Sequence, residues 1–198
     1  LLNNIRNNQC TAEDMEPLHR HYHPGYEGKP GDDYITLTTH NAKADYINQN
    51  QLAALRGKCY SFASEITGNF NDRALPADKT LQLKVGAQVM FIKNDKGESR
   101  RFFNGKIAHV ARIDNDAIHV RFPGEEGELE LEKETWRNIR YQYNREKDSI
   151  EEEELGTFKQ YPIRLAWAVT IHKSQGLTFE KAIIDAGASF APGQVYVA

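Results

Sequence analysis

A polar string that could bind phosphate follows an apolar run near the end of the chain. The string His-Lys-Ser-Gln-Gly occupies 172–176, directly after the run at 163–171, whose hydrophobic residues are typical of a buried strand. Histidine, lysine, serine and glutamine side chains donate hydrogen bonds to phosphate oxygens, and glycine lets a backbone approach closely. Parallel α/β sheets bind ligands where buried strands end. A polar turn before the next apolar strand, 182–184, would use the same residue types.

A second polar group follows another predicted strand, 34–38. Thr38 and Thr39 end this strand, and Asn41 is a good N-cap for a helix that runs to about Leu55. Hydroxyl groups and a helix N-terminus suit a phosphate. The same three residues could serve only as a turn and a cap.

A third candidate is the dipeptide Asn104-Gly105, whose commonest use is a hairpin turn. The neighbouring Phe102 and Phe103 could stack on nucleic-acid bases or fill a core, and we expect at least one to be a core residue. Basic residues crowd this stretch, namely Lys93, Lys96, Arg100, Arg101, Lys106 and Arg112.

The chain lacks a loop of the type that cradles ATP phosphates, Gly-x-x-x-x-Gly-Lys-Ser/Thr, in which a hydroxyl meets Mg²⁺. Its Gly-Lys pairs are followed by Pro30, Cys59 and Ile107. The strand at 183–185 is similar to a Walker B strand, but Ala186 stands where the catalytic glutamate would be.

The remaining pattern predicts the elements that position these groups. Thr11 and Asp14 indicate a capping box for a helix over 11–22, and alternation at Tyr60, Phe62 and Ile66 indicates a strand. Short strands are expected at 85, 89–92, 106–113, 117–122 and 127–131, then a ribbon around 136–143. Strands at this spacing favour a small barrel. The acidic run 151–154 is interpreted as a solvated hairpin tip, and the His-x-His-x-His string at 19–23 is not expected to bind metal.

Composition indicates a globular, non-membrane chain. The 198 residues are 39% hydrophobic and carry a formal net charge of −3. The mean hydropathy is −0.68, and no apolar run approaches the roughly 20 residues that span a bilayer. Cys10 and Cys59 lack metal-like spacing and are interpreted as free thiols. We therefore expect an intracellular, reducing compartment, either cytoplasm or nucleoid, or nucleus or mitochondrion.

Three strings together resemble a known family. Residues 166–179 resemble motif V of superfamily-one DNA helicases, in the branch that holds the Pif-type and RecD-type 5′-to-3′ enzymes. Residues 34–48 resemble motif IV, and 193–198 resemble the opening of motif VI. The stretch 2–6 is similar to the segment that leaves the first motor domain. With 83–90 and 104–105, the resemblance covers nearly the whole chain in the correct order.

The resemblance implies a fold and a division of the chain. The fold is α/β, a RecA-like parallel-sheet domain with an inserted small SH3-like β-barrel. Residues 1–83 would form the first segment of the second RecA-like domain, beginning with the end of the interdomain connection. Residues 84–157 would form the barrel insertion, and 158–198 the second segment.

The resemblance also implies a function, the C-terminal motor and DNA-gripping portion of an ATP-dependent 5′-to-3′ DNA helicase. Its partners would be single-stranded DNA, duplex or structured DNA and the first RecA-like domain of the same protein, with no membrane and a monomeric state. ATP and Mg²⁺ would be bound mainly by the missing first domain. This chain alone lacks the Walker motifs and the motif VI arginine, so we expect it not to hydrolyse ATP, and no catalytic or metal-binding residue is assigned in it. Nucleotide-facing residues would be Gln175 and Gly176, and DNA-binding residues would be Thr38, Thr39, Asn41, Asn104, Thr170, His172, Lys173 and Ser174.

Three alternatives remain open. The chain could be part of a RecD-type or relaxase-type helicase, or a stand-alone single-stranded-DNA-binding module without ATP hydrolysis. A barrel that binds Pro-rich peptides is the third, and it needs an exposed aromatic groove.

Overall fold

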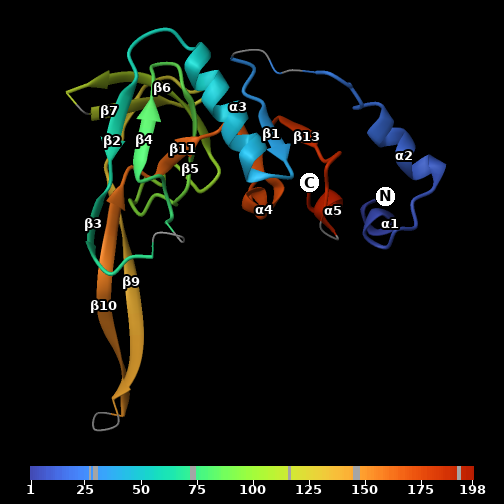
Figure 1. Cartoon of the computed structure of the whole chain (residues 1–198). Coiled ribbons are helices and arrows are strands. Elements are labelled where there is room, and N and C mark those ends of the chain that lie inside the picture. The colour runs from blue at the N-terminus through green and yellow to red at the C-terminus, as the bar shows by residue number, and fades with distance from the viewer. Residues whose placement is uncertain (27, 29–30, 72–74, 116, 145–147, 191–192) are drawn as a thin grey trace. The chain divides into compact units, whose positions relative to one another are not determined.

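The computed structural model describes residues 1–26, 28, 31–71, 75–115, 117–144, 148–190 and 193–198 (Figure 1). The chain forms two compact units. Unit 1 consists of residues 1–49 and 167–198, and unit 2 of residues 50–166. Together they give the mixed α/β fold that the sequence predicts, with parallel and antiparallel sheets.

A parallel three-stranded sheet is the centre of unit 1. Its order is β12 (Ala168–Thr170), β1 (Ile35–Thr38) and β13 (Ala182–Asp185), and both outer strands run parallel to β1. Ile35 is fully buried and Leu37 is nearly so, as is typical of a parallel strand flanked on both edges.

The apolar run at 163–171 forms two strands, so its prediction as one strand was wrong. Residues Ile163–Leu165 form β11, which pairs antiparallel with β5 in unit 2, whereas β12 joins the parallel sheet of unit 1. The backbone changes partners between Ala166, whose N–H donates to Gln88, and Trp167, whose carbonyl accepts from Thr36. The hydrophobic pattern of a sequence indicates that a run is buried, but it does not indicate which sheet the run joins.

The helix α3 (Asn41–Ala54) follows β1, close to the predicted span. Its first residue is Asn41, so the cap position falls one residue earlier, on His40, whose carbonyl accepts the Ala44 N–H; the predicted Asn41 cap was wrong. Within unit 1, the buried Asn48 side chain bonds both the N–H and the C=O of Ala168 at 2.9 Å. These two hydrogen bonds fix α3 against β12.

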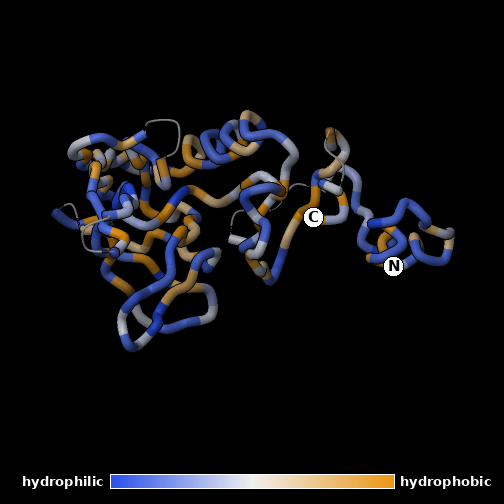
Figure 2. Tube along the Cα trace, turned by 90° about the horizontal axis from the view of Figure 1, so that it is seen from below, coloured by the Kyte–Doolittle hydropathy of each residue, from blue (hydrophilic) through white to orange (hydrophobic). Residues whose placement is uncertain are grey.

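Two short N-terminal helices, α1 (Leu2–Arg6) and α2 (Ala12–His19), bury no residue of their own. They are mainly hydrophilic in Figure 2. The predicted capping box is confirmed, since Thr11 Oγ1 accepts from Asp14 N and the Asp14 carboxylate accepts from Thr11 N. The Asn4 amide and then the Thr11 backbone hold the pKa of Asp14 at about 2. The helix ends at His19, before the predicted residue 22.

Unit 2 contains a five-stranded antiparallel sheet in the order β11-β5-β6-β7-β8. Its further strands are β5 (Gln88–Phe91), β6 (Ile107–Asp114), β7 (Ala117–Arg121) and β8 (Leu129–Glu130), close to the predicted spans. Alternate residues such as Ile118 and Val120 fill its core. No sheet of the described residues closes into a barrel, so the predicted SH3-like barrel is not confirmed.

A long hairpin extends from the rest of unit 2 (Figure 1). Its strands, β9 (Glu134–Asn144) and β10 (Ser149–Gln160), pair along nearly their whole length, and β3 (Glu65–Gly68) pairs with the second half of β10. A separate pair joins β2 (Tyr60–Ala63) to β4 (Thr80–Leu83), so the single strand predicted around residues 60–66 is two strands in two sheets. The acidic run 151–154 lies within β10 and not at the tip, which corrects that prediction. Its carboxylates face cross-strand partners on β9, as in the pairs Arg137–Glu154 and Arg140–Glu153.

The assignment of 1–83, 84–157 and 158–198 to helicase segments stays a prediction. Among the described residues, no helix is long and apolar enough to cross a membrane. Both cysteines are free thiols, as predicted, and both are exposed.

Candidate functional site

The carboxyl ends of the three parallel strands of unit 1 form one row. Thr38, at the end of β1, lies opposite Thr170 of β12 on one side and Asp185 of β13 on the other. We call this row, with the residues 171–176 and 39–41 that follow it, the sheet edge. The first two polar groups recognised in the sequence therefore meet in space. Sites in parallel α/β sheets lie at such an edge.

The short helix α4 (Ile171–Ser174) decides which side chains of the polar string reach solvent. Ile171 and Ser174 face inward and are buried, whereas His172 and Lys173 are exposed. The Ser174 hydroxyl donates to the Ile171 carbonyl at 2.8 Å. One helical turn therefore presents a histidine and a lysine outward and uses the serine internally.

The threonines at the sheet edge are buried, and the hydroxyls of Thr38 and Thr39 have partners inside unit 1. Thr38 Oγ1 donates to the His40 carbonyl at 3.1 Å, and Thr39 Oγ1 lies 2.7 Å from His40 Nδ1. Thr170 is 4% exposed. Asn41 by contrast is exposed at the start of α3. These threonines hold the backbone and His40 in place, and Asn41 is the member of this group that faces solvent.

Two residues that the sequence reasoning missed connect the polar strings. The Phe190 ring lies 4.9 Å from the His40 ring and 6.2 Å from the His172 ring. Gln194, 3% exposed, accepts from Phe190 N at 3.1 Å and donates to the Thr39 carbonyl at 3.4 Å. A single aromatic residue within a stretch of small residues, Gly-Ala-Ser-Phe-Ala-Pro-Gly, was the available signal for Phe190.

The carboxylate at the sheet edge has a partner within unit 1. Asp185 forms an ion pair with Lys43 of α3. Gln175 and Gly176 follow α4 and are exposed, and Gly176 has a φ of +78°, with open space where a Cβ would stand. This left-handed conformation explains the glycine at the turn.

The third candidate, Asn104, lies in unit 2 in a loop between β5 and β6, which we call the Asn104 loop (residues 94–105). The backbone N–H of Asn104 donates to Asn94 Oδ1 at 2.8 Å, and its side chain is exposed. Asp95 accepts from the N–H groups of Gly97 and Arg101 at 2.8 and 2.9 Å. The Gly97 hydrogen bond, with further help from Arg101, lowers the pKa of Asp95.

The aromatic pair beside Asn104 is divided as predicted. Phe102 is 9% exposed and stacks on Phe91 with ring centroids 4.1 Å apart, whereas Phe103 is 52% exposed. Four of the nearby basic side chains lie in ion pairs with acidic groups of unit 2, namely Lys93, Arg101, Lys106 and Arg112. The basic stretch is therefore largely compensated.

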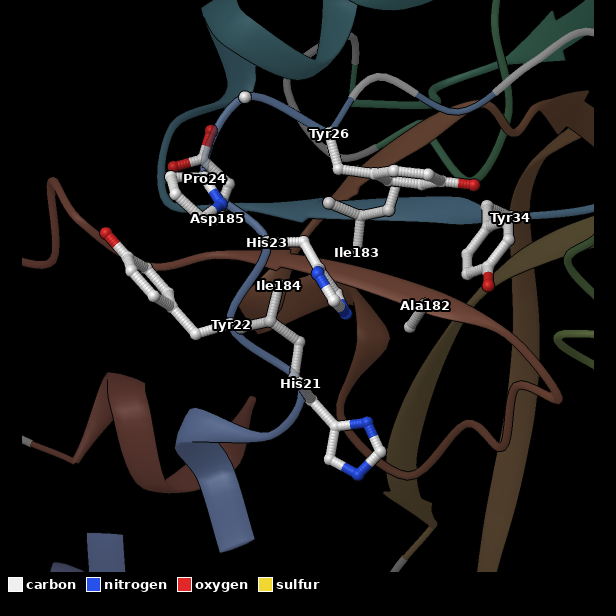
Figure 3. Close-up of a pocket in the computed structure, with 11 residues that line it drawn as sticks. His21, Tyr22, His23, Pro24, Tyr26, Tyr34, Ala182, Ile183, Ile184 and Asp185 are labelled. Atoms are coloured by element: carbon white, nitrogen blue, oxygen red, sulfur yellow. The ribbon is translucent and has the colours of Figure 1, made fainter. Parts of the chain in front are cut away.

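A pocket of about 760 Å³ lies beside β13 in unit 1 (Figure 3). Its walls combine aromatic rings with aliphatic side chains of the strand, including Tyr22, His23, Tyr26, Tyr34, Ile183 and Ile184. In Figure 3 the side chains of His21 and Tyr22 point away from each other. Among the described residues no group of His, Cys, Asp or Glu side chains could hold a metal ion.

Comparisons with known proteins point to one group of enzymes, although no protein-family model matches the chain. The ATP-dependent DNA helicase Pif1 of Bdellovibrio bacteriovorus is 31% identical over 206 residues, which span all of this chain and 43% of the relative. The crystal structure of Bacteroides sp. Pif1 in complex with ADP-AlF4 matches with a TM-score of 0.86 and 36% identity, over 99% of this chain and 44% of that one. Bacteroides Pif1 bound to ssDNA matches with a TM-score of 0.74, also at 36% identity, over 100% of this chain and 44% of that one. The chain thus spans less than half the length of these relatives.

Proposed function

Because this chain is homologous over its whole length to Pif1 helicases, we propose that it is the second RecA-like, DNA-gripping portion of an ATP-dependent 5′-to-3′ DNA helicase. The resemblance to Pif-type helicases found in the sequence is confirmed, and the partial coverage of the relatives is consistent with a C-terminal portion of such an enzyme. Polarity, the grip on DNA and the domain role are our proposal.

The pairing of Thr38 with Thr170 is the observation that carries this proposal. It brings the motif IV string and the motif V string to one edge of a parallel sheet. Donors at such an edge suit an anion, and phosphate is the anion that every nucleotide of a DNA strand repeats. A grip on phosphates carries no sequence information, as a translocating motor requires.

The proposed roles follow from exposure. His172, Lys173 and Asn41 donate to backbone phosphates of single-stranded DNA, since their side chains face solvent. Thr38, Thr39, Thr170 and Ser174 support them from inside by holding the strand ends and α4. Asn104 provides a further contact from unit 2, and Gln175 and Gly176 face the nucleotide in the intact protein.

ATP and Mg²⁺ act at the junction with the first RecA-like domain, which we propose supplies the phosphate cradle. The Gly-Lys pairs of this chain lack the hydroxyl that follows in such a loop. Phosphoryl transfer requires charge stabilisation around the γ-phosphate, so we expect no DNA-stimulated turnover by this chain alone. Nucleotide binding would close the two domains on the strand, and hydrolysis would release it.

Binding of a labelled oligonucleotide by the intact protein tests the grip. In fluorescence anisotropy, His172→Ala should weaken binding by about tenfold, the order of one hydrogen bond to a charged group, and Thr39→Ala should also weaken binding. Thr39 acts here through His40, to which its hydroxyl is bonded. His21→Ala is the matched control, because His21 is an exposed histidine of unit 1 outside the sheet edge. Unchanged affinity in both variants, with unchanged thermal stability, would contradict a phosphate grip here.

A further inference from the structure

We propose that Phe190 stacks on a base of the bound strand, directly beside the phosphate grip. The proposal rests on the proposed function and adds to it a contact of a different chemical kind. It concerns a residue outside all three motif strings of the sequence.

Phe190 is held at the sheet edge by its own backbone. Its N–H donates to the buried Gln194 side chain, which also bonds the Thr39 carbonyl at the end of β1. The preceding Ser189 closes a turn, because both its N–H and its hydroxyl donate to the Ala186 carbonyl, at 3.0 and 2.6 Å. Hydrogen bonds of Phe190 and of the residue before it therefore fix the backbone position from which the ring extends.

The ring is large, apolar and 65% exposed. It contacts the rings of His40 and His172, which are tilted against it by 46° and 47°. These contacts occupy only part of its surface. An isolated exposed phenylalanine would need no explanation, but this one is placed by a buried glutamine and touches a histidine from each of two motif strings.

The chemistry of a nucleotide matches this arrangement. Each nucleotide presents a phosphate and, across the sugar, a flat apolar base. His172 and Lys173 supply donors for the phosphate, and Phe190 supplies an aromatic surface within ring-contact distance of His172. Stacking on an aromatic side chain accepts any base, because every base has a π-face. A motor can therefore use such a contact without sequence preference.

Binding to two oligonucleotides of equal length distinguishes base stacking from other roles of the Phe190 ring. One is an oligothymidylate, and the other carries abasic sugars on the same phosphodiester backbone. The intact protein is compared as wild type, Phe190→Ala and Phe190→Tyr by fluorescence anisotropy. Tyr46→Ala is the matched control, since Tyr46 is a 67% exposed aromatic residue of unit 1 on α3.

Phe190→Ala should weaken binding of the oligothymidylate by about 5- to 150-fold, the range of one base–aromatic stack, and leave the affinity for the abasic strand unchanged. Phe190→Tyr and Tyr46→Ala should bind both as the wild type does. An equal loss on both strands would overturn the proposal and make Phe190 a support for the histidines. No loss on either strand would also overturn it. Failure of the proposed function is a different result, absence of wild-type binding to both strands, and it would overturn both proposals.

Discussion

The sheet edge of unit 1 and the Asn104 loop of unit 2 both present polar side chains to solvent, but they are built in different ways. The sheet edge joins residues about 130 positions apart, since Thr38 lies beside Thr170 only through strand pairing. The Asn104 loop is tied by its own side chains, Asn94 and Asp95, which bond backbone groups two to ten residues away. One site depends on a sheet, and the other on a local turn.

This difference predicts how each of the two sites should respond to a destabilising substitution. Removing core volume from the parallel sheet should disorder the sheet edge as a whole. In the Asn104 loop, removing one hydrogen bond should disorder only the few residues that this bond holds, because each hydrogen bond there is local.

The largest expected effect follows from the core of the parallel sheet. Ile35→Ala should destabilise unit 1 by about 2–5 kcal/mol, because Ile35 is fully buried and the truncation leaves a cavity. Hydrogen exchange should then quicken in β1, β12 and β13, while the Gly97 and Arg101 amides keep their protection. Ile184→Ala, at a 55% exposed position of the same sheet, should change stability by no more than about 0.5 kcal/mol. Equal exchange in both regions of Ile35→Ala would remove the distinction between them.

The next effect follows from the amide that ties α3 to β12. Asn48→Ala leaves the N–H and C=O of Ala168 without their side-chain partners, which should cost about 1–3 kcal/mol in urea denaturation. Asn50→Ala, an exposed asparagine of the same helix, is the matched control and should stay within about 0.5 kcal/mol of the wild type. Equal stability of the two variants would mean that the buried amide does not hold the sheet edge.

A smaller effect on stability should accompany a visible effect on binding at Lys43. Its ion pair with Asp185 is about half exposed, so Lys43→Ala should cost no more than about 1 kcal/mol. The uncompensated Asp185 carboxylate should then repel phosphate at the sheet edge and weaken binding of single-stranded DNA. Adding Asp185→Asn should restore most of the affinity, as measured by anisotropy. A double variant that binds as weakly as Lys43→Ala would show that the carboxylate is not the cause.

The smallest expected effect is the pH dependence of hydrogen-exchange protection in the Asn104 loop. The pKa of Asp95 is lowered, chiefly by the Gly97 N–H, so the ionised carboxylate stabilises the folded loop. That contribution is fully present above the unfolded pKa of about 3.9 and disappears as the pH falls through the lowered folded value. Exchange at Gly97 and Arg101, corrected for its intrinsic pH dependence, should therefore stay slow in the wild type at pH 5 and be faster in Asp95→Ala at that pH, and the two should converge as the pH falls below the folded pKa of Asp95. Equal protection in that variant would contradict the local tie.

Local features of the fold were predictable because their causes lie within a few residues. The capping box at Thr11 and Asp14, the helix from Asn41 and the strands β5, β6 and β7 follow from side-chain chemistry and alternation. The five-stranded sheet was not predictable as an open sheet, because strand spacing says nothing about closure. Its edge strand β11 comes from an apolar run whose other half, β12, belongs to a different sheet.

The candidate site was predictable only in part, namely where its residues lie in local motif strings. Two motif strings identified the strand ends, and the structure adds that Thr38, Thr39 and Ser174 use their hydroxyls internally. Phe190 and Gln194 were missed because their importance depends on contacts with Thr39 and His172 that no spacing encodes. Such residues can be identified from burial and long-range pairing in the structure, but not from composition.

The salt dependence of binding to single-stranded DNA tests the grip at the sheet edge most directly. Lys173 is exposed on α4, after the carboxyl end of β12, whereas Lys181 is an exposed lysine directly before the amino end of β13. Each variant, Lys173→Ala and Lys181→Ala, is titrated by anisotropy over a salt series in the intact protein. Lys173→Ala should reduce the slope of log Kobs against log salt concentration by about 0.7, the value for one phosphate of a single strand, and Lys181→Ala should leave it unchanged. Equal slopes in the two variants would contradict a DNA grip at the carboxyl edge of this sheet.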